Sequence, residues 1–193
     1  FCEFSAFDRW FDATVTENDR LNQNFTRPDG SSVELAQGYM VTLLNTLYQP
    51  FSISKVTGVP LPYSPYVFGQ FYKQVKFLLY TTSPGYKGFH VGDSMDYNVS
   101  RVSFIKMLSE LFKEDEELKY VATNGSQGKL PDFTSVTFPD GLWTVMRSDW
   151  SDKALALHIG AKGIGSHGHR DQLSISMFAY GKYLLTDQSY GTI

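Results

Sequence analysis

The chain has 193 residues, a formal net charge of −3, and 42% hydrophobic and 16% aromatic residues. This length allows one large domain or two small ones around a buried core. The charge does not suggest nucleic-acid binding, and no apolar run approaches the length of a membrane span. A single cysteine, Cys2, excludes a disulfide within these residues and a thiolate metal cluster. Because Phe1 is not an initiator methionine, we expect the chain to be a segment of a larger protein.

Apolar residues at helical spacing predict a helical first part. Glu34 is expected in the first turn of the second helix, where the helix dipole favours an acid. The acidic run at residues 114–117 is expected to be a solvated face. The predicted helices are a short amphipathic one within residues 1–28, one from Ser31 or Ser32 to about Gln49 and ending before Pro50, one at about Pro65–Thr82, and one at about Val99–Val121.

Beyond Leu130 the apolar period changes from helical to alternating, which is typical of strands. We therefore expect an α+β fold with a helical domain at residues 1–130 and an antiparallel β domain at residues 131–193. The predicted strands are Ser135–Phe138, Leu142–Arg147, Lys153–Ile159, and a hairpin made by residues 173–179 and 183–186.

Two of the four histidines, His167 and His169, precede this hairpin at a spacing of two residues. On an extended backbone both imidazoles lie on one face, and with Asp187 they form a reasonable set of zinc ligands. An ordinary polar loop explains the same spacing. In the predicted hairpin Asp187 lies opposite about Ser176, so the glycine-rich 163–169 loop must fold back to bring His169 within reach.

The segment Ser-His-Gly-His-Arg-Asp-Gln-Leu-Ser, followed by an apolar strand, Ala-Tyr-Gly-Lys and Leu-Leu-Thr-Asp, resembles the heparinase II/III-like polysaccharide lyases. That group includes related alginate lyases. Residues 143–150, Trp-Thr-Val-Met-Arg-Ser-Asp-Trp, resemble the strand that opens the β domain of the family. The resemblance implies the C-terminal part of an (α/α) toroid followed by the start of an antiparallel β-sandwich.

The resemblance also implies separate roles for these side chains. His169 and Asp187 match ligands of a structural zinc ion, whose third ligand is a histidine further downstream than this chain reaches. His167 matches a histidine that faces the substrate cleft. Residues 28–39 resemble a family segment that ends in the catalytic tyrosine, here Tyr39. Many members continue with histidine where this chain has Met40, and Tyr39 could instead be a core aromatic on the helix.

Members of this family cleave uronic-acid glycans by β-elimination. A base removes the C5 proton and an acid protonates the departing oxygen at C4, while hydrogen-bonding or positive groups stabilise the developing enolate. Tyr39 and His167 are the candidate catalytic residues, and Arg147, Arg170 and Glu34 are the candidate substrate-binding residues. Guanidinium groups pair well with carboxylates, although structural ion pairs would explain both arginines, and Glu34 could cap the helix or orient its neighbours.

The sequence therefore predicts a lyase that acts on an acidic polysaccharide, either heparin- or heparan-sulfate-like or alginate-like. The scarcity of clustered Lys and Arg disfavours a heavily sulfated substrate. Two alternatives stay open: a non-catalytic glycan-binding module with a structural metal, and a hydrolase in which His167, His169 and Asp187 hold a metal that activates water. The resemblance implies a periplasmic or secreted bacterial protein. His90, Asp93 and His158 are expected to be structural.

Overall fold

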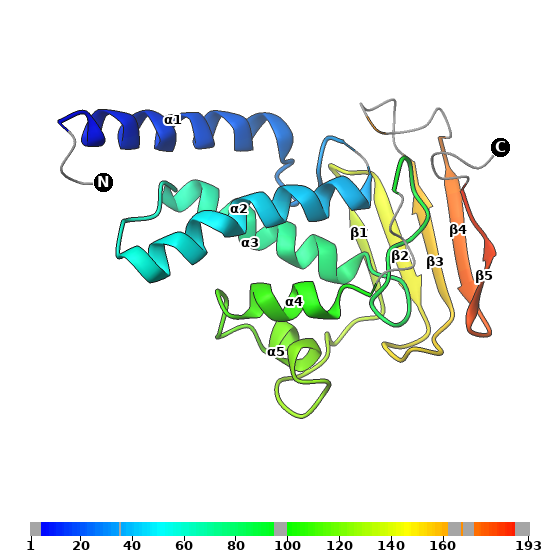
Figure 1. The fold of residues 1–193 in the computed structure, drawn as a ribbon. Helices are drawn as coiled ribbons and strands as arrows, with labels where there is room; N and C mark the ends of the chain where they lie inside the picture. Colours follow the sequence, from blue (N-terminus) through cyan, green and yellow to red (C-terminus); the bar gives the residue numbers. More distant parts are fainter. Residues whose placement is uncertain (1–4, 35, 95–99, 162–166, 168–171, 188–193) are drawn as a thin grey trace.

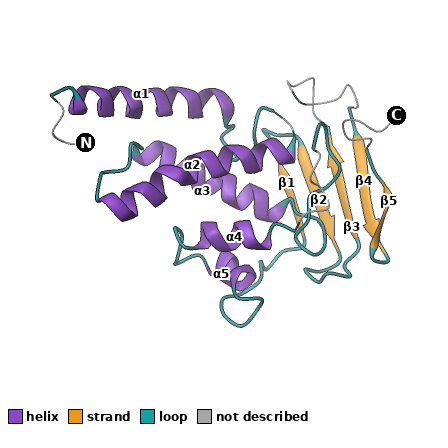
Figure 2. Ribbon diagram, in the orientation of Figure 1, coloured by secondary structure: helices purple, strands orange, loops and turns teal. Residues whose placement is uncertain are grey.

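The computed structural model describes residues 5–34, 36–94, 100–161, 167 and 172–187. Helices come first in the chain and strands last, and the helices lie on one side of the sheet (Figures 1 and 2). The predicted α+β fold with an antiparallel sheet is confirmed. The elements are α1 Phe7–Phe25, α2 Gln37–Thr57, α3 Pro65–Tyr80, α4 Val102–Ser109, α5 Glu116–Ala122, β1 Ser135–Phe138, β2 Trp143–Arg147, β3 Ala156–Gly160, β4 Ser174–Ala179 and β5 Lys182–Leu185.

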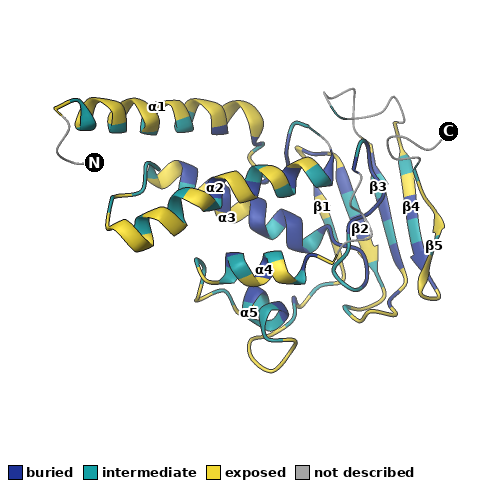
Figure 3. Cartoon of the chain, in the orientation of Figure 1, coloured by how far each residue is buried: buried dark blue, intermediate teal, exposed yellow. Residues whose placement is uncertain are grey.

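The third predicted helix, α3, begins where local signals place it. Ser64 caps it, because its Oγ accepts a hydrogen bond from the Val67 amide at 3.2 Å, and Pro65 occupies the first turn. Helix α1 is longer than predicted, and most of its side chains are exposed (Figure 3). Asn22 is its one buried residue. None of the helices within the described residues is long and apolar enough to cross a membrane.

The predicted start of α2 at Ser31 or Ser32 is wrong. Both serines act in the turn that precedes the helix: Ser31 Oγ donates to Asp29 Oδ1 at 2.6 Å, and Ser32 Oγ accepts from the Glu34 amide at 3.1 Å. Side-chain hydrogen bonds of this kind compete with helix formation. Glu34 consequently lies before α2 and not in its first turn.

The predicted end of α2 before Pro50 is also wrong, because the helix continues through this proline to Thr57. The turn beyond the proline has tertiary support, since the ring centroids of Phe51 and Phe68 of α3 lie 5.9 Å apart. The helix ends at Gly58, whose φ of 71° is left-handed and whose amide donates to Ser54 O at 2.8 Å. Tertiary packing has overridden the local stop signal.

The single helix predicted at 99–121 is two helices, α4 and α5. Asp115 starts the second one, because its Oδ1 accepts hydrogen bonds from the amides of Glu117 at 3.0 Å and Leu118 at 2.8 Å. Lys76 of α3 binds Asp115 Oδ2 at 2.8 Å and Glu117 Oε2 at 2.5 Å. The acidic run is thus not a solvated face throughout, since the Asp115 and Glu117 side chains are only 5% and 17% exposed.

The five strands pair in chain order, β1-β2-β3-β4-β5. The hairpin of β4 and β5 turns at Tyr180 and Gly181, whose φ values of 54° and 79° match the preferred two-residue turn. On the face towards the helices, Val145 pairs with His158, and His158 pairs with Ser176. His158 is fully buried, and its ring centroid lies 4.5 Å from the ring centroid of Trp143. His158 is therefore a core residue.

One hydrophobic core joins the helices to the sheet. It includes Met40 and Phe77 from the helices and Trp143 and Phe178 from the strands. Phe77 and Trp143 meet edge to face, with centroids 5.4 Å apart. Side chains from before and after Leu130 belong to this one core. The domain boundary near Leu130 stays a prediction.

Asp29 provides a polar connection between the same two parts of the fold. Its Oδ2 accepts hydrogen bonds from the amides of Asp140 at 2.8 Å and Gly141 at 3.0 Å, in the turn between β1 and β2. Its Oδ1 binds the amide and hydroxyl of Ser31. Burial acts to raise the pKa of Asp29, but these hydrogen bonds outweigh burial and lower it. The turn that leads into α2 is therefore fastened to the sheet.

Candidate active site

Tyr39 and His167, the two predicted catalytic residues, are in direct contact. Their rings stack with centroids 3.6 Å apart and planes 12° apart. Tyr39 lies in the first turn of α2 and is 38% exposed, so it is not a core side chain. The buried face of this helix is instead formed by Met40, Leu44 and Leu47. The pair presents a phenol and an imidazole at the solvent boundary.

Asp93 contacts His167 through both its backbone and its side chain. The Asp93 amide donates to His167 O at 3.1 Å, and Asp93 Oδ2 lies 3.5 Å from His167 Nδ1. The two side chains are 26% and 29% exposed. A carboxylate beside a ring nitrogen favours a proton on that nitrogen and fixes the orientation of the imidazole.

Asp187, at the end of β5, approaches this contact from the sheet. Its Oδ2 accepts a hydrogen bond from the Gly92 amide at 3.1 Å. Gly92 precedes Asp93, so the predicted metal ligand and His167 contact adjacent residues of one loop. The fold thus brings Asp187 towards the histidine loop.

His169 and Arg170 lie outside the described residues. Of the two predicted zinc ligands, the structure therefore describes Asp187. Among the described residues there is no group of three or more His, Cys, Asp or Glu side chains that could hold a metal ion. Asp187 supplies a hard carboxylate oxygen donor, which suits zinc as well as other divalent ions. The zinc site and its ligand set stay a prediction.

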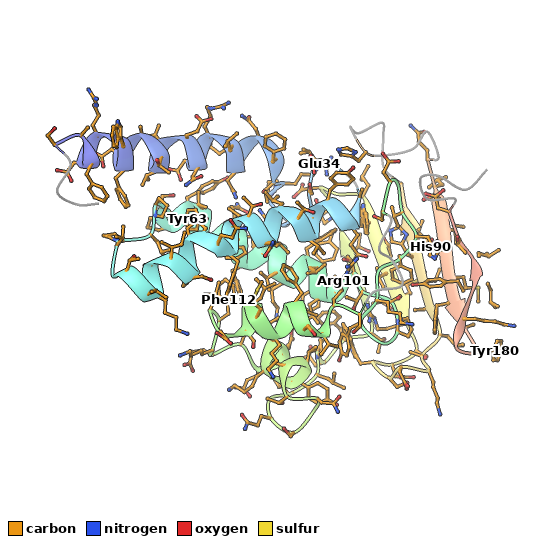
Figure 4. The ribbon with its side chains drawn as sticks, in the orientation of Figure 1. Glu34, Tyr63, His90, Arg101, Phe112 and Tyr180 are labelled. Atoms are coloured by element: carbon orange, nitrogen blue, oxygen red, sulfur yellow. The ribbon has the colours of Figure 1, made fainter. Side chains whose placement is uncertain are left out.

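His90 belongs to the same loop and supports the end of β5. Its Nδ1 lies 3.1 Å from Thr186 Oγ1, and its carbonyl accepts a hydrogen bond from Ser176 Oγ at 2.8 Å. Burial lowers the pKa of His90 more than a backbone hydrogen bond at Asp187 raises it. Figure 4 shows His90 beside the sheet. These contacts are consistent with its predicted structural role.

Glu34 lines a pocket of about 370 Å³ between α1 and α2, which also includes Tyr39. Figure 4 shows Glu34 near the end of α2 that faces the sheet. The predicted substrate-binding carboxylate and the predicted catalytic phenol therefore share one cavity. The other lining residues are Asn18, Leu21, Asn22, Phe25, Thr26, Thr42, Leu43, Thr46 and Leu47, so the walls combine apolar side chains with amides and hydroxyls.

Arg147 has backbone partners at the end of α3. Its Nη2 donates to Tyr80 O at 2.6 Å and Thr82 O at 3.1 Å, and its guanidinium lies 3.8 Å from the centroid of Trp150. Burial lowers the pKa of Arg147 to about 10. A cation at a helix C-terminus stabilises the helix, which gives Arg147 a structural role. Its role in binding substrate stays a prediction.

The sequence predicts a structural role for Asp93, and it does not predict the contact of Asp93 with His167. The available signal was the Gly-Asp-Ser turn at residues 92–94, which resembles a family motif. Glycine is needed at the first position, because Gly92 has a φ of 57° and a Cβ there would lie 2.5 Å from His167 O. The motif therefore marks the place where this loop meets His167, the predicted catalytic histidine.

No family model matches the chain. It is 23% identical over 190 residues to a heparin-sulfate lyase of Pedobacter heparinus, covering 97% of this chain and 29% of that protein. A heparin-sulfate lyase of Bacteroides thetaiotaomicron is 23% identical over 191 residues, covering 92% of this chain and 26% of that protein. The chain thus spans less than a third of the length of these curated relatives.

Solved structures with similar names also match the chain. A heparinase III matches with a TM-score of 0.89 at 24% identity, covering 100% of this chain and 31% of that one. The heparan sulfate lyase HepC of Pedobacter heparinus matches with a TM-score of 0.84 at 22% identity, covering 95% and 29%. These matches establish the fold, and together with the curated relatives they confirm the resemblance to heparinase-like polysaccharide lyases.

Proposed function

We propose that the protein is a polysaccharide lyase that cleaves an acidic glycosaminoglycan of the heparin or heparan sulfate type by β-elimination. The observation that carries this proposal is the stack of Tyr39 on His167 at the solvent boundary. The names of the curated relatives support the choice of glycan. An alginate-like uronate undergoes the same chemistry and is the second substrate to test.

Elimination at a uronic acid breaks the bond between C4 and its glycosidic oxygen. In the proposed reaction the Tyr39 oxygen takes the C5 proton and delivers a proton to the departing oxygen, while the electron pair of the C5–H bond forms the C4–C5 double bond. His167 neutralises the substrate carboxylate, or acts as the base on the opposite C5 epimer. Stacking holds the two rings face to face, which places the phenol and the imidazole close enough to contact one sugar unit.

The pocket beside Tyr39 has a place in this proposal. Its volume of about 370 Å³ suits part of a glycan chain, and the hydroxyls of Thr42 and Thr46 in its mostly apolar wall can accept hydrogen bonds from sugar hydroxyls. Glu34 is the proposed substrate-binding residue here, because it shares this pocket with the phenol. Arg170, next to His169 in the chain, is proposed to pair with a substrate carboxylate or sulfate.

Three further parts of the proposal rest on the resemblance of the sequence to the heparinase II/III-like lyases. The helices form part of an (α/α) toroid, and the sheet belongs to an antiparallel β-sandwich. His169 and Asp187 would hold a zinc ion, which would shape the loop that presents His167 and would take no part in the elimination. The protein is periplasmic or secreted.

Ultraviolet absorbance tests the proposed reaction, because the C4–C5 double bond is conjugated with the carboxylate and absorbs. The complete protein is incubated with heparan sulfate, heparin, alginate, hyaluronan and chondroitin. We expect absorbance to rise on heparan sulfate or heparin. Cleavage without absorbance would identify a hydrolase, and intact glycans throughout would favour a binding module.

The variant Tyr39→Phe tests the role of the hydroxyl separately from that of the aromatic ring. The variant keeps the stack on His167, so we expect an unchanged melting temperature and a loss of elimination rate of about 10²- to 10⁴-fold. Tyr66→Phe is the matched control, since Tyr66 also lies in the first turn of a helix and is 43% exposed. Wild-type rates in Tyr39→Phe would remove this hydroxyl from the mechanism.

A further inference from the structure

The 88–94 loop lies between the sheet and the start of α2, and it is anchored to β4 and β5. Tyr183 OH donates to Gly88 O, Ser176 Oγ donates to His90 O at 2.8 Å, and Thr186 Oγ1 lies 3.1 Å from His90 Nδ1. These bonds come from three residues of the hairpin. The loop therefore has a defined position relative to the sheet.

The far end of the same loop holds α2. Ala36, at the helix N-cap position, has no side-chain hydrogen bond to offer. Ser94 replaces it from a distance, because Ser94 Oγ accepts a hydrogen bond from the Gly38 amide at 3.1 Å. Gly38 directly precedes Tyr39, so Ser94 stabilises the helical turn that carries the phenol.

Asp93, the neighbour of Ser94, holds the other half of the stack. Its amide donates to His167 O at 3.1 Å, and its Oδ2 lies 3.5 Å from His167 Nδ1. The second distance is at the long end for a hydrogen bond, and hydrogen bonds of catalytic groups are often long without substrate and tighten in the complex with it. Two adjacent residues of one loop therefore hold both partners of the Tyr39–His167 pair.

We propose that Asp93 is a positioning residue of the lyase: its carboxylate directs Nδ1–H of His167 towards itself and leaves Nε2 as the nitrogen that meets the substrate. This inference rests on the proposed function. A carboxylate that accepts the proton of one imidazole nitrogen sets the tautomer and holds the ring plane. Here that plane is the one that stacks on Tyr39, so the orientation of both reacting groups depends on Asp93.

The kinetic test compares Asp93→Ala with Asp93→Asn in the complete protein. We expect Ala to lower kcat by about 10- to 100-fold, in the range of losses seen when a group that orients a functional histidine is removed. KM and the melting temperature should stay near wild type, because the backbone bond to His167 is unchanged. Asn keeps an acceptor oxygen but loses the negative charge, so it should restore only part of the rate. The same substitutions at Asp149, in the loop after β2, are the control.

A spectroscopic readout is independent of activity. Nitrogen-15 spectra of the imidazoles, assigned with a His167→Gln variant, report which nitrogen of neutral His167 carries the proton. We expect Nδ1–H in the wild type and a shift towards Nε2–H in Asp93→Ala. An unchanged tautomer, or a kcat in Asp93→Ala within twofold of wild type, would overturn the inference. A wild-type protein that eliminates no glycan would refute the proposed function, and the spectra would still test the Asp93 contact.

Discussion

Lys76 joins α3 to α5 through the most buried ion pairs that the described residues contain, and Lys76→Met tests their contribution. Its Nζ lies 2.8 Å from Asp115 Oδ2 and 2.5 Å from Glu117 Oε2. The side chains of Lys76, Asp115 and Glu117 are 15%, 5% and 17% exposed. Methionine preserves the length and apolar character of the lysine stem but removes the only cation in this group.

The expected cost follows from the two carboxylates left behind. Removing one partner of a buried ion pair typically costs about 3–5 kcal/mol. Two tyrosine hydroxyls remain as donors, since Tyr72 OH and Tyr80 OH each lie 2.6 Å from a carboxylate oxygen of Asp115 and Glu117, respectively. Burial and these hydrogen bonds raise the pKa of both tyrosines, so the hydroxyls keep their protons. We therefore expect the lower end, a loss of about 3 kcal/mol in the free energy of unfolding.

The pH dependence of this loss is a second signature. Burial acts to raise the pKa of Asp115, but the hydrogen bonds from Lys76 and Tyr72 outweigh it and hold the pKa below the usual 3.8. A folded-state pKa below the unfolded one stabilises the protein fully above pH 3.8, and this stability is lost as the pH falls through the folded value. The difference between wild type and Lys76→Met should thus be full at pH 7 and shrink below pH 3.8.

Urea unfolding followed by circular dichroism measures the difference, and thermal unfolding should show a melting temperature lower by about 6–12 °C. Lys119→Met is the control, because the Lys119–Glu116 pair lies on α5 itself and its side chains are 33% and 46% exposed. The control should unfold like the wild type. A Lys76→Met variant that is no less stable than Lys119→Met, at pH 7, would refute the reasoning.

Two further predictions concern Asp29, which connects the turn before α2 to the sheet, and His169, the predicted zinc ligand. Asp29→Asn replaces one acceptor oxygen by an NH2 group, which cannot accept the hydrogen bonds that the backbone amides of Asp140 and Gly141 donate. We therefore expect a loss of about 1–3 kcal/mol in the free energy of unfolding. A melting temperature equal to that of the wild type would contradict the role of Asp29. His169→Ala should lose bound zinc and lower the melting temperature, because a structural metal contributes to folding. Metal analysis of the purified protein checks this, and an unchanged zinc content would remove His169 from the ligand set.

Elements whose signals are local were predicted well from the sequence. The bounds of β1 agree with the structure, and α3 begins at Pro65 after the Ser64 cap as expected. A hairpin between residues 173–179 and 183–186 was also predicted, and in the structure its turn lies at Tyr180 and Gly181. Alternation, caps and turns act between residues that are neighbours in the chain, so the sequence alone determines them.

Tertiary contacts contributed to each element that was predicted wrongly. Ser94, from a distant loop, caps α2 at Gly38, and the start of α5 at Asp115 is held by Lys76 of α3. Pro50 stands inside α2 although local rules end the helix there. A hydrogen bond or ion pair from another element changes the balance at a helix end, and no pattern within the segment records that partner.

The residues of the candidate site were predicted from the sequence, but their arrangement was not. Residue types and motifs identified Tyr39, His167 and Asp187 one by one from the sequence. Their arrangement exists only in the folded protein: Tyr39 stacks on His167, Asp93 contacts the imidazole, and Gly92 binds Asp187. Tyr39 lies in a helix, His167 and the Gly92–Asp93 pair lie in two different loops, and Asp187 lies beyond the end of β5. Only the packing of the helices against the sheet brings these residues within bonding distance.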